Sequence, residues 1–156
     1  AGSAPRWVMP IQLVSSRFGV LAIAAEDVLY FPAGLPGLED CRTWVLLADA
    51  RNDALAWLQS VSRAEVCLAV VSPSRFVPGY RLRVSQMELS SLGLESASEG
   101  EVLAVVSSHS GHLTLNLKAP LVIHPEKRLG RQVVASDEQP LRFPLPQHSP
   151  YLRRSA

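Results

Sequence analysis

Residues 101–117 read EVLAVVSSHSGHLTLNL, and this stretch carries the clearest structural signal in the chain. Two apolar runs, 101–107 and 113–117, flank a short polar segment that contains Gly111. Apolar runs of this length around a short linker with glycine are typical of a β-hairpin. The sequence therefore predicts an antiparallel pair of strands here and a fold based on β-structure.

Short apolar runs of the same kind recur on both sides of this hairpin. The twelve prolines and nine glycines are spread along the chain, so that few segments could hold a helix of three turns. Strands of about 5–6 residues at short spacing favour a closed barrel or a sandwich. Further strands are predicted at residues 11–14, 19–24, 27–31, 43–48, 65–72, 121–123, 132–135 and 141–145.

Two segments instead suggest short helices. Residues 53–60 (DALAWLQS) place Leu55 and Leu58 three positions apart, with Asp53 as a possible N-cap. Residues 85–92 (SQMELSSL) have Glu88 three positions after a serine and Gly93 just beyond the end. That arrangement matches a capping box followed by a glycine stop.

Length and composition bound the class of protein. The 156 residues favour one domain, and 47% hydrophobic against 19% charged residues is enough to form a core. The net charge of +1 argues against a surface built for nucleic acid or an anionic membrane. No apolar run reaches the roughly 18 residues of a membrane span.

The cysteines and the chain ends suggest a location and domain limits. Cys41 and Cys67 form no CxxC and no disulfide ladder, so a reducing compartment fits best, and we expect a cytoplasmic protein. Residues 9–145 are expected to form a single domain. Residues 1–8 are predicted to be a disordered N-terminal tail or an expression remnant, and residues 146–156 a flexible C-terminal tail.

The chain offers little that resembles a reactive centre. His109 and His112 lie in the predicted hairpin loop, where no further metal ligand stands at motif spacing. There is no G-x-S-x-G and no glycine-rich phosphate loop. We therefore expect no catalytic, metal or cofactor-binding residue. Two alternatives stay open: a small hydrolase that uses residues 107–112, and a small RNA-binding β-barrel that uses Arg128 and Arg131 of a basic loop with Lys127.

Three loop segments have pronounced turn chemistry. Residues 31–39 (FPAGLPGLE) hold Gly34 and Gly37, which permit positive φ, in a bend or a functional loop. Residues 73–80 (PSRFVPGY) carry Phe76 and Tyr80, as a flap over the core or as partner anchors. Residues 114–121 (TLNLKAPL) alternate, which places Thr114, Asn116 and Lys118 on one face, and Asn116 is expected to hydrogen-bond a turn or an edge strand.

These segments occur in an order that resembles the flagellar assembly factor FliW family, over almost the whole length from about Met9 to Leu145. GLPG at residues 34–37 and NLKAP at residues 116–120 are the most specific of them. The others are RFG at 17–19, LQS at 58–60, Pro73 with Phe76, Pro78 and Tyr80, LGL at 92–94, and QVV at 132–134.

The resemblance implies a mainly β fold, a small closed or partly closed β-barrel with one or two short helices, and no enzymatic activity. FliW-like proteins bind the translational regulator CsrA, antagonise its repression of flagellin translation, and also bind flagellin. A monomer is expected, with no membrane and no direct nucleic-acid partner. The family motifs predict these partner-binding residues: Gly34, Leu35, Pro36, Gly37, Glu39, Gln59, Phe76, Pro78, Tyr80, Asn116, Lys118 and Pro120.

Overall fold

The computed structural model describes residues 10–146 of the chain. Within that range it contains eleven strands, one α-helix and three short 3-10 helices. The strands are β1 (Ile11–Ser15), β2 (Gly19–Ile23), β3 (Val28–Tyr30), β4 (Thr43–Ala48), β5 (Leu55–Ser60), β6 (Cys67–Val71), β7 (Glu101–His109), β8 (His112–Leu115), β9 (Leu121–His124), β10 (Leu129–Gln132) and β11 (Phe143–Pro144). The helices are η1 (Ala25–Asp27), η2 (Pro73–Arg75), α1 (Gln86–Ser91) and η3 (Ala97–Glu99).

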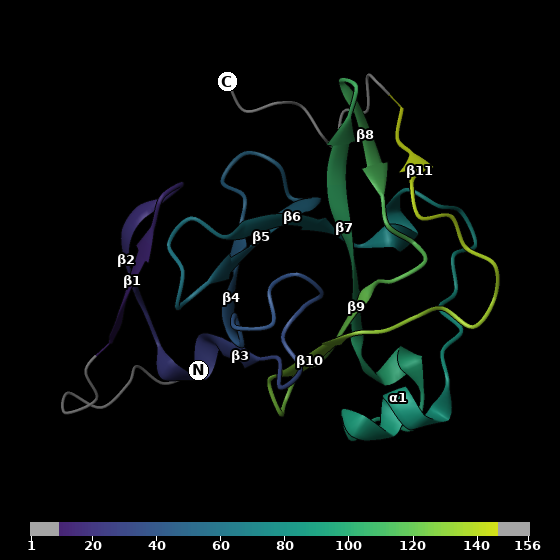
Figure 1. The fold of residues 1–156 in the computed structure, drawn as a ribbon, viewed down its shortest axis with the longest axis horizontal. Coiled ribbons are helices and arrows are strands. Elements are labelled where there is room, and N and C mark those ends of the chain that lie inside the picture. The colour runs from purple at the N-terminus through teal and green to yellow at the C-terminus, as the bar shows by residue number, and fades with distance from the viewer. Residues whose placement is uncertain (1–9, 147–156) are drawn as a thin grey trace.

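Seven of the strands close into a barrel, in the order β7-β6-β5-β4-β3-β10-β9, and β9 pairs back to β7 (Figure 1). Neighbours are antiparallel except β3 and β10, which are parallel. Because β9 pairs back to β7, each of the seven strands has a paired neighbour on both sides. The predicted mainly β barrel is confirmed, and the sandwich alternative is wrong.

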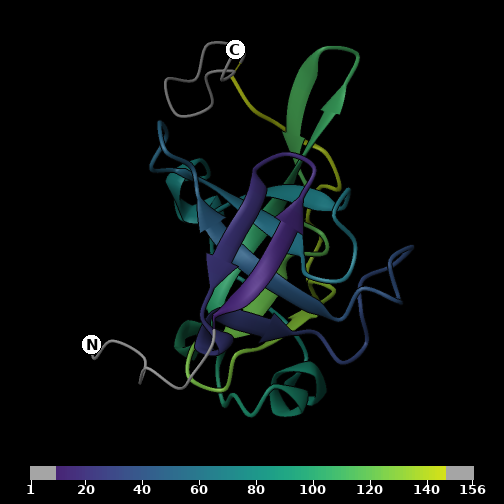
Figure 2. The same ribbon diagram turned by 90° about the vertical axis from the view of Figure 1, so that its left-hand side faces the viewer.

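The predicted hairpin at residues 101–117 is confirmed. β7 and β8 pair from Val106↔Leu115 to His109↔His112, and they extend above the barrel (Figure 2). The two turn residues both have positive φ, 51° at Ser110 and 81° at Gly111. Such a turn matches the right-handed twist of the flanking strands.

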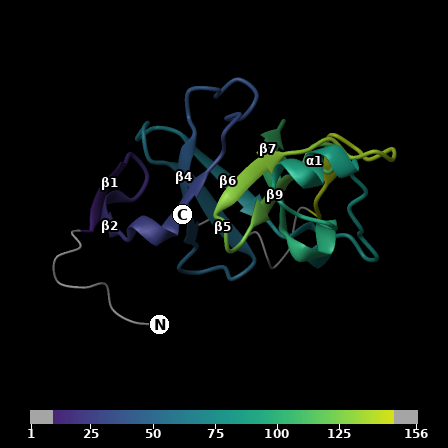
Figure 3. The ribbon, with the colours of Figure 1, turned by 90° about the horizontal axis from the view of Figure 1, so that it is seen from below.

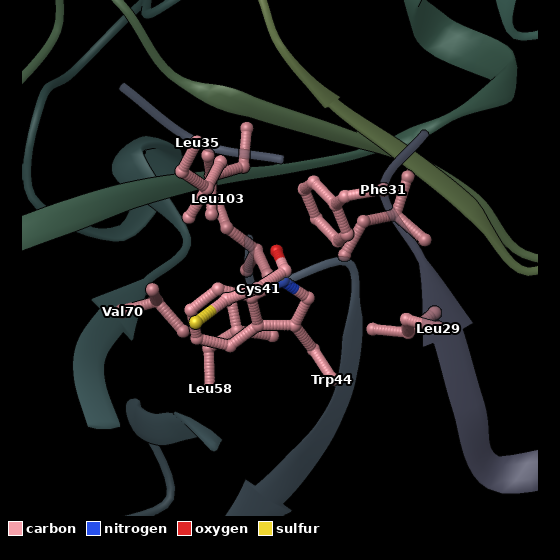
Figure 4. Packing of buried hydrophobic residues seen from close by; sticks show 10 residues of the cluster. Leu29, Phe31, Leu35, Cys41, Trp44, Leu58, Val70 and Leu103 are labelled. Atoms are coloured by element: carbon pink, nitrogen blue, oxygen red, sulfur yellow. The ribbon is translucent and has the colours of Figure 1, made fainter. Parts of the chain in front are cut away.

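The barrel interior holds the largest group of buried side chains. Leu29, Phe31, Trp44, Leu58 and Val70 point inward and are at most 1% exposed (Figure 4). The rings of Phe31 and Trp44 meet edge to face with centroids 6.3 Å apart. The Trp44 indole Nε1 donates a 2.9 Å hydrogen bond to the Cys41 carbonyl, so this buried polar atom is paired.

The β1–β2 hairpin forms a separate two-stranded sheet outside the barrel, on the side away from α1 (Figure 3). Its Leu13 and Ile23 pack on Val45 of β4. The outer face carries the facing pair Val14 and Val20, which are 54% and 61% exposed. The hairpin is therefore held against the barrel by one apolar cluster, which the polar contacts described below reinforce.

The predicted helix at residues 85–92 is confirmed as α1. Ser85 caps it by accepting a hydrogen bond from the Glu88 N–H, and Gly93 follows with φ +75°. The reciprocal half of the capping box is absent from the described contacts, because Glu88 Oε2 accepts instead from the Val134 N–H. That bond fixes α1 to the segment after β10.

The predicted helix at residues 53–60 is wrong, because residues 55–60 form strand β5. β5 lies between β4 and β6 and pairs with both over five residues each. Pairing on two sides outweighs the weak local preference of a short segment for helix. Asp53 does not cap a helix, and its carboxylate lies 3.5 Å from the Arg75 guanidinium.

The strand predicted at residues 132–135 is also displaced, since β10 covers Leu129–Gln132. The turn after β9 closes through the Arg128 N–H to His124 carbonyl bond, with Arg128 at φ 55°. The strand can therefore begin at Leu129, and Arg131 lies on it rather than in a basic loop.

The remaining predicted strands agree with the structure to within a few residues, and 43–48 agrees in full. Among the described residues, no helix is long and apolar enough to cross a membrane. The tails predicted at residues 1–8 and beyond Pro146 lie outside the described range.

Candidate partner-binding surfaces

The predicted partner-binding residues lie in two regions, not in one patch. The first region is the β3–β4 loop, residues 31–42, together with Gln59. The second is the β6–α1 segment, residues 72–85, whose Phe76 and Tyr80 pack on the same cluster as Leu117. Asn116, Lys118 and Pro120 follow β8 in the chain, and Leu117 among them packs in that cluster.

The β3–β4 loop is held by its own backbone. The Gly34 N–H donates to the Phe31 carbonyl at 2.8 Å, and the Leu38 N–H to the Leu35 carbonyl at 2.7 Å. Gly34 and Gly37 have φ of 64° and 81°, as predicted. The loop is therefore a preorganised turn that loses little conformational freedom when a partner binds.

Only part of this loop can touch a partner directly. Gly34 and Leu35 are buried, with Leu35 inserted into the barrel cluster (Figure 4). Pro36, Gly37 and Glu39 are exposed, and the Glu39 carboxylate accepts a 3.0 Å bond from the Gly37 N–H. The side chain of Leu35 therefore packs the barrel, and its place among the partner-binding residues stays a prediction.

Gln59 is fully buried, so the structure shows it in a packing and hydrogen-bonding position, and its partner-binding role stays a prediction. Its Oε1 accepts a 2.8 Å hydrogen bond from the Ser15 hydroxyl. Its Nε2 lies 3.0–3.2 Å from the carbonyls of Ser60, Ala64 and Val66. The amide thus links the β1–β2 hairpin to the turn between β5 and β6 from inside the molecule.

An ion-pair chain joins that turn to the β3–β4 loop at the surface. Arg63 Nη1 lies 3.7 Å from Asp40 Oδ2, and Arg63 Nε lies 2.8 Å from Glu65 Oε1. All three side chains are well exposed, so the pairs add little to stability. With Glu39, they place three carboxylates on this surface beside the guanidinium groups of Arg63 and Arg42.

An aromatic cluster at the β1–β2 turn was not predicted as a site. The Arg17 guanidinium lies 3.7 Å from the centroid of the Trp57 ring, and Phe18 meets Trp57 edge to face at 6.0 Å. The Trp57 indole donates a 3.0 Å bond to Asp49. RFG at residues 17–19 was the available sequence signal, but only the fold shows that Trp57 lies beneath it.

Asp49 is expected to have a lower pKa than an ordinary aspartate. The bond from the Trp57 indole holds the pKa of Asp49 below its usual range, and the Arg51 and Asn52 N–H groups act in the same direction. Because the folded pKa is depressed, this carboxylate stabilises the fold above the unfolded pKa. That contribution is lost as the pH falls through the folded pKa.

An NMR titration of the Trp57 indole N–H resonance measures this directly. We expect its midpoint below the ordinary aspartate value of about 3.9, and we expect Asp49→Asn to remove the transition. Asp53→Asn, an exposed neighbour, is the matched control and should leave it unchanged. A midpoint at or above the ordinary value would contradict the assignment.

In the second region, Phe76 and Tyr80 form a flap over a second core. Both are half-buried against the cluster of Val71, Leu115 and Leu117. The Tyr80 hydroxyl is buried and has no hydrogen-bond partner among the described residues. Burial raises the pKa of the Tyr80 phenol, and the nearby Asp137 carboxylate adds to the increase.

Tyr80→Phe is therefore expected to leave the free energy of unfolding unchanged or to raise it by up to about 1 kcal/mol, since an unpaired buried hydroxyl is removed. Denaturant unfolding of both proteins measures the difference. A loss of stability of about 1 kcal/mol or more would show that the hydroxyl has a partner in solution.

The NLKAP segment, residues 116–120, is mainly structural. The Asn116 side chain accepts a 2.9 Å bond from the Ala119 N–H, which confirms the predicted turn bond. Pro120 is buried and Lys118 is exposed, so only the lysine faces solvent fully. The predicted alternation holds less well, because Thr114 is buried at 8% exposure rather than on an open face with Lys118.

The structure describes the metal-ligating groups, the two arginines of the RNA-binding alternative and the Cys67 thiol. In the described part of the chain, no group of three or more His, Cys, Asp or Glu could hold a metal ion. Arg128 Nη2 donates to the Asp27 carbonyl and Arg131 Nη1 to the Ser91 hydroxyl, each at 3.0 Å. Burial raises the pKa of the Cys67 thiol, which disfavours a reactive thiolate.

Comparison with known proteins agrees with this architecture. A family model described as FliW protein matches residues 12–145. The flagellar assembly factor FliW of Bdellovibrio bacteriovorus is 35% identical over 125 residues, which cover 79% of this chain and 71% of the relative. That of Moorella thermoacetica is 34% identical over 127 residues, with 80% of each protein covered.

A solved structure has the same fold. The crystal structure of a flagellar assembly factor FliW superimposes with a TM-score of 0.76 at 24% identity, covering 86% of this chain and 94% of the other. The fold of this chain is therefore one that crystallography has recorded.

Proposed function

The chain belongs to the FliW family of flagellar assembly factors, and from this premise we propose that it is a non-enzymatic regulator that binds both CsrA and flagellin. In this function it antagonises the repression of flagellin translation by CsrA. Free flagellin competes for the chain and so releases CsrA. The proposal places the protein in the cytoplasm as a monomer.

The observation that carries the proposal is family membership across residues 12–145, combined with a surface of preorganised loops. The β3–β4 loop presents Pro36, Gly37 and Glu39 on a rigid turn. Rigid loops fit recognition of other proteins, because little order is imposed on binding. An exchange of partners then requires only a modest difference: a tenfold change in relative occupancy corresponds to about 1.4 kcal/mol.

Isothermal titration of the purified chain against CsrA and against flagellin, in separate experiments, tests the proposal. We expect saturable binding to each and no turnover of any substrate. Absence of binding to both would overturn it.

The β3–β4 loop is proposed as one binding face, and a conservative variant tests it. Glu39→Gln keeps an acceptor for the Gly37 N–H but removes the charge, so binding of one partner should weaken by about three- to tenfold, which corresponds to about 0.7–1.4 kcal/mol. Glu26→Gln is the matched control, since Glu26 is exposed on η1, at the opposite end of β3 from the loop. Equal affinities of both variants for both partners would exclude Glu39 as a contact.

A further inference from the structure

The β1–β2 hairpin carries a single charged side chain, that of Arg17 in its turn. The rest of the hairpin consists of apolar residues, glycine, serine and glutamine. Its outer face presents two facing pairs of exposed side chains, Val14 with Val20 and Gln12 with Ala22. No described element lies in front of this face (Figure 2). The hairpin therefore offers an uncharged, largely apolar face with one cation at its end.

The guanidinium of Arg17 is held in place by stacking. Its Cζ lies 3.7 Å from the centroid of the Trp57 ring and 5.9 Å from that of the Phe18 ring. The shorter distance is van der Waals contact, and a cation over the face of an indole is attracted to it. Stacking restricts the rotamers of a long side chain, which would otherwise lose much of its freedom on binding. The charge is therefore positioned before any partner arrives.

The backbone that carries Arg17 is fixed as well. The Ser15 hydroxyl accepts from the N–H of Arg17 at 3.2 Å and from that of Phe18 at 3.0 Å. The Ser16 N–H donates a 2.9 Å bond to the carbonyl of Ala64, in the turn between β5 and β6. Both the main chain and the guanidinium of Arg17 are thus anchored to the barrel, so that little order is imposed on binding.

The N–H groups of the Arg17 guanidinium have no acceptor among the described residues, in either an ion pair or a hydrogen bond. The nearby carboxylate of Asp49 is engaged elsewhere. Its Oδ1 accepts from the Trp57 indole, and its Oδ2 accepts from the N–H groups of Arg51 and Asn52. Because the donors of a guanidinium form a planar fork, an external carboxylate is the group that they fit best.

We propose that the outer face of the β1–β2 hairpin binds a polypeptide segment in which an acidic residue stands between apolar residues, with its carboxylate on Arg17. The carboxylate pairs with the guanidinium fork, and its apolar neighbours cover Val14 and Val20. Arginine and aromatic anchors beside apolar surface are the residues that most often carry the energy of protein interfaces. The face uses none of the residues that the family motifs predict as partner contacts, so it goes beyond the proposed function.

Charge and geometry favour a polypeptide over other anionic partners. A nucleic acid is held through several phosphates and by bases that stack on open aromatic faces. Arg17 is the only charge of the hairpin, and it already covers one face of Trp57. An anionic membrane adds only about 1 kcal/mol for each basic residue near its surface. One carboxylate is the anion that one fixed guanidinium neutralises.

End-blocked peptides of the pattern Gly-Ser-X-Glu-Z-Ser-Gly, with Leu, Val or Phe at X and Z, are the probes. Their one carboxylate is that of the glutamate, and a matched set has glutamine in its place. NMR titration of the isotope-labelled chain, followed at the Arg17 Nε–H and the Trp57 indole N–H, measures their binding. A uridine oligonucleotide and vesicles of phosphatidylglycerol are titrated in parallel.

We expect glutamate peptides to shift both resonances, and glutamine peptides to bind at least about tenfold more weakly, or about 1.4 kcal/mol. Arg17→Gln should weaken the binding of glutamate peptides by about tenfold. Arg17→Lys should restore only part of that affinity, because an ammonium lacks the planar fork. Val14→Ser should weaken binding by about threefold through lost apolar contact. Arg142→Gln, at an exposed position beside β11 on the other side of the molecule (Figure 1), is the matched control and should bind as the wild type does.

Three results would overturn the inference: no shift with any glutamate peptide, equal affinity for glutamate and glutamine peptides, or equal affinity of the wild type and Arg17→Gln. Binding of the oligonucleotide or the vesicles in place of the peptides would do the same. Arg17 is exposed, so its variants are expected to fold. If Arg17→Gln does not fold, the two peptide sets on the wild type and on Val14→Ser carry the test. No titration here contains CsrA or flagellin, so the outcome is independent of the proposed function.

Discussion

Gly34→Ala is expected to destabilise the protein by about 3 kcal/mol or more, because two costs add at this position. Gly34 has φ +64°, which an alanine adopts only with strain. A Cβ built there would lie 2.7 Å from both Cα and the carbonyl oxygen of Glu39. These are backbone atoms of a turn locked by its own hydrogen bonds, so they cannot move aside cheaply.

Gly37→Ala is the matched control in the same loop. Gly37 has φ +81°, but a Cβ there would meet nothing within 4 Å. Its cost should be limited to backbone strain of about 1 kcal/mol. Denaturant unfolding followed by tryptophan fluorescence measures both variants. Equal stability of the two alanine variants would contradict the packing of the β3–β4 loop described here.

Gln59→Leu is the second change with a large expected effect. Leucine keeps most of the volume but removes every polar contact of a fully buried amide. The Ser15 hydroxyl loses its acceptor, and the carbonyls of Ser60, Ala64 and Val66 lose a shared donor. The carbonyls of Ala64 and Val66 keep the N–H groups of Ser16 and Ser60 as donors, so the cost comes mainly from the Ser15 hydroxyl and the Ser60 carbonyl. Since each buried polar group left unpaired costs about 1–3 kcal/mol, we expect a total loss of about 2 kcal/mol or more.

The same change should loosen the β1–β2 hairpin before the barrel. The Ser15 hydroxyl, which Gln59 orients, accepts from the N–H groups of Arg17 and Phe18. Hydrogen exchange at these two amides should therefore accelerate in Gln59→Leu. Gln12→Leu is the matched control, because Gln12 is exposed on β1. If Gln59→Leu were as stable as Gln12→Leu, the buried network would have no structural weight.

Features governed by neighbours in the sequence could be predicted. The hairpin of β7 and β8 depends on two apolar runs around Ser110 and Gly111, and α1 on the Ser85 cap and Gly93. Each signal lies within a few residues of the structure that it specifies. Positive φ at Gly34 and Gly37 followed in the same way from local turn chemistry.

Features that depend on distant pairing could not be predicted. Residues 55–60 carry a weak helical pattern, and only the flanking strands β4 and β6 make them a strand. The roles of Gln59 and Trp57 are of the same kind, because their partners are distant in the sequence. Ser15 lies 44 positions before Gln59, and Arg17 lies 40 positions before Trp57 (57 − 17). A glutamine inside a family motif is equally compatible with a surface contact until its burial is known.

The two regions of predicted site residues have a consequence for mechanism. The β3–β4 loop and the β6–α1 segment are different elements, so in the proposed function the two partners can bind at distinct faces. Exchange between two partners requires that binding at one face disfavours binding at the other, or that the partners overlap. Either route makes the two binding events mutually exclusive.

Size-exclusion chromatography of the preformed complex with CsrA, to which flagellin is then added, tests the central claim most directly. The account predicts that the chain elutes with flagellin and that CsrA appears as a separate free species. A stable complex that contains all three proteins, or no complex of the chain with either partner, would contradict it.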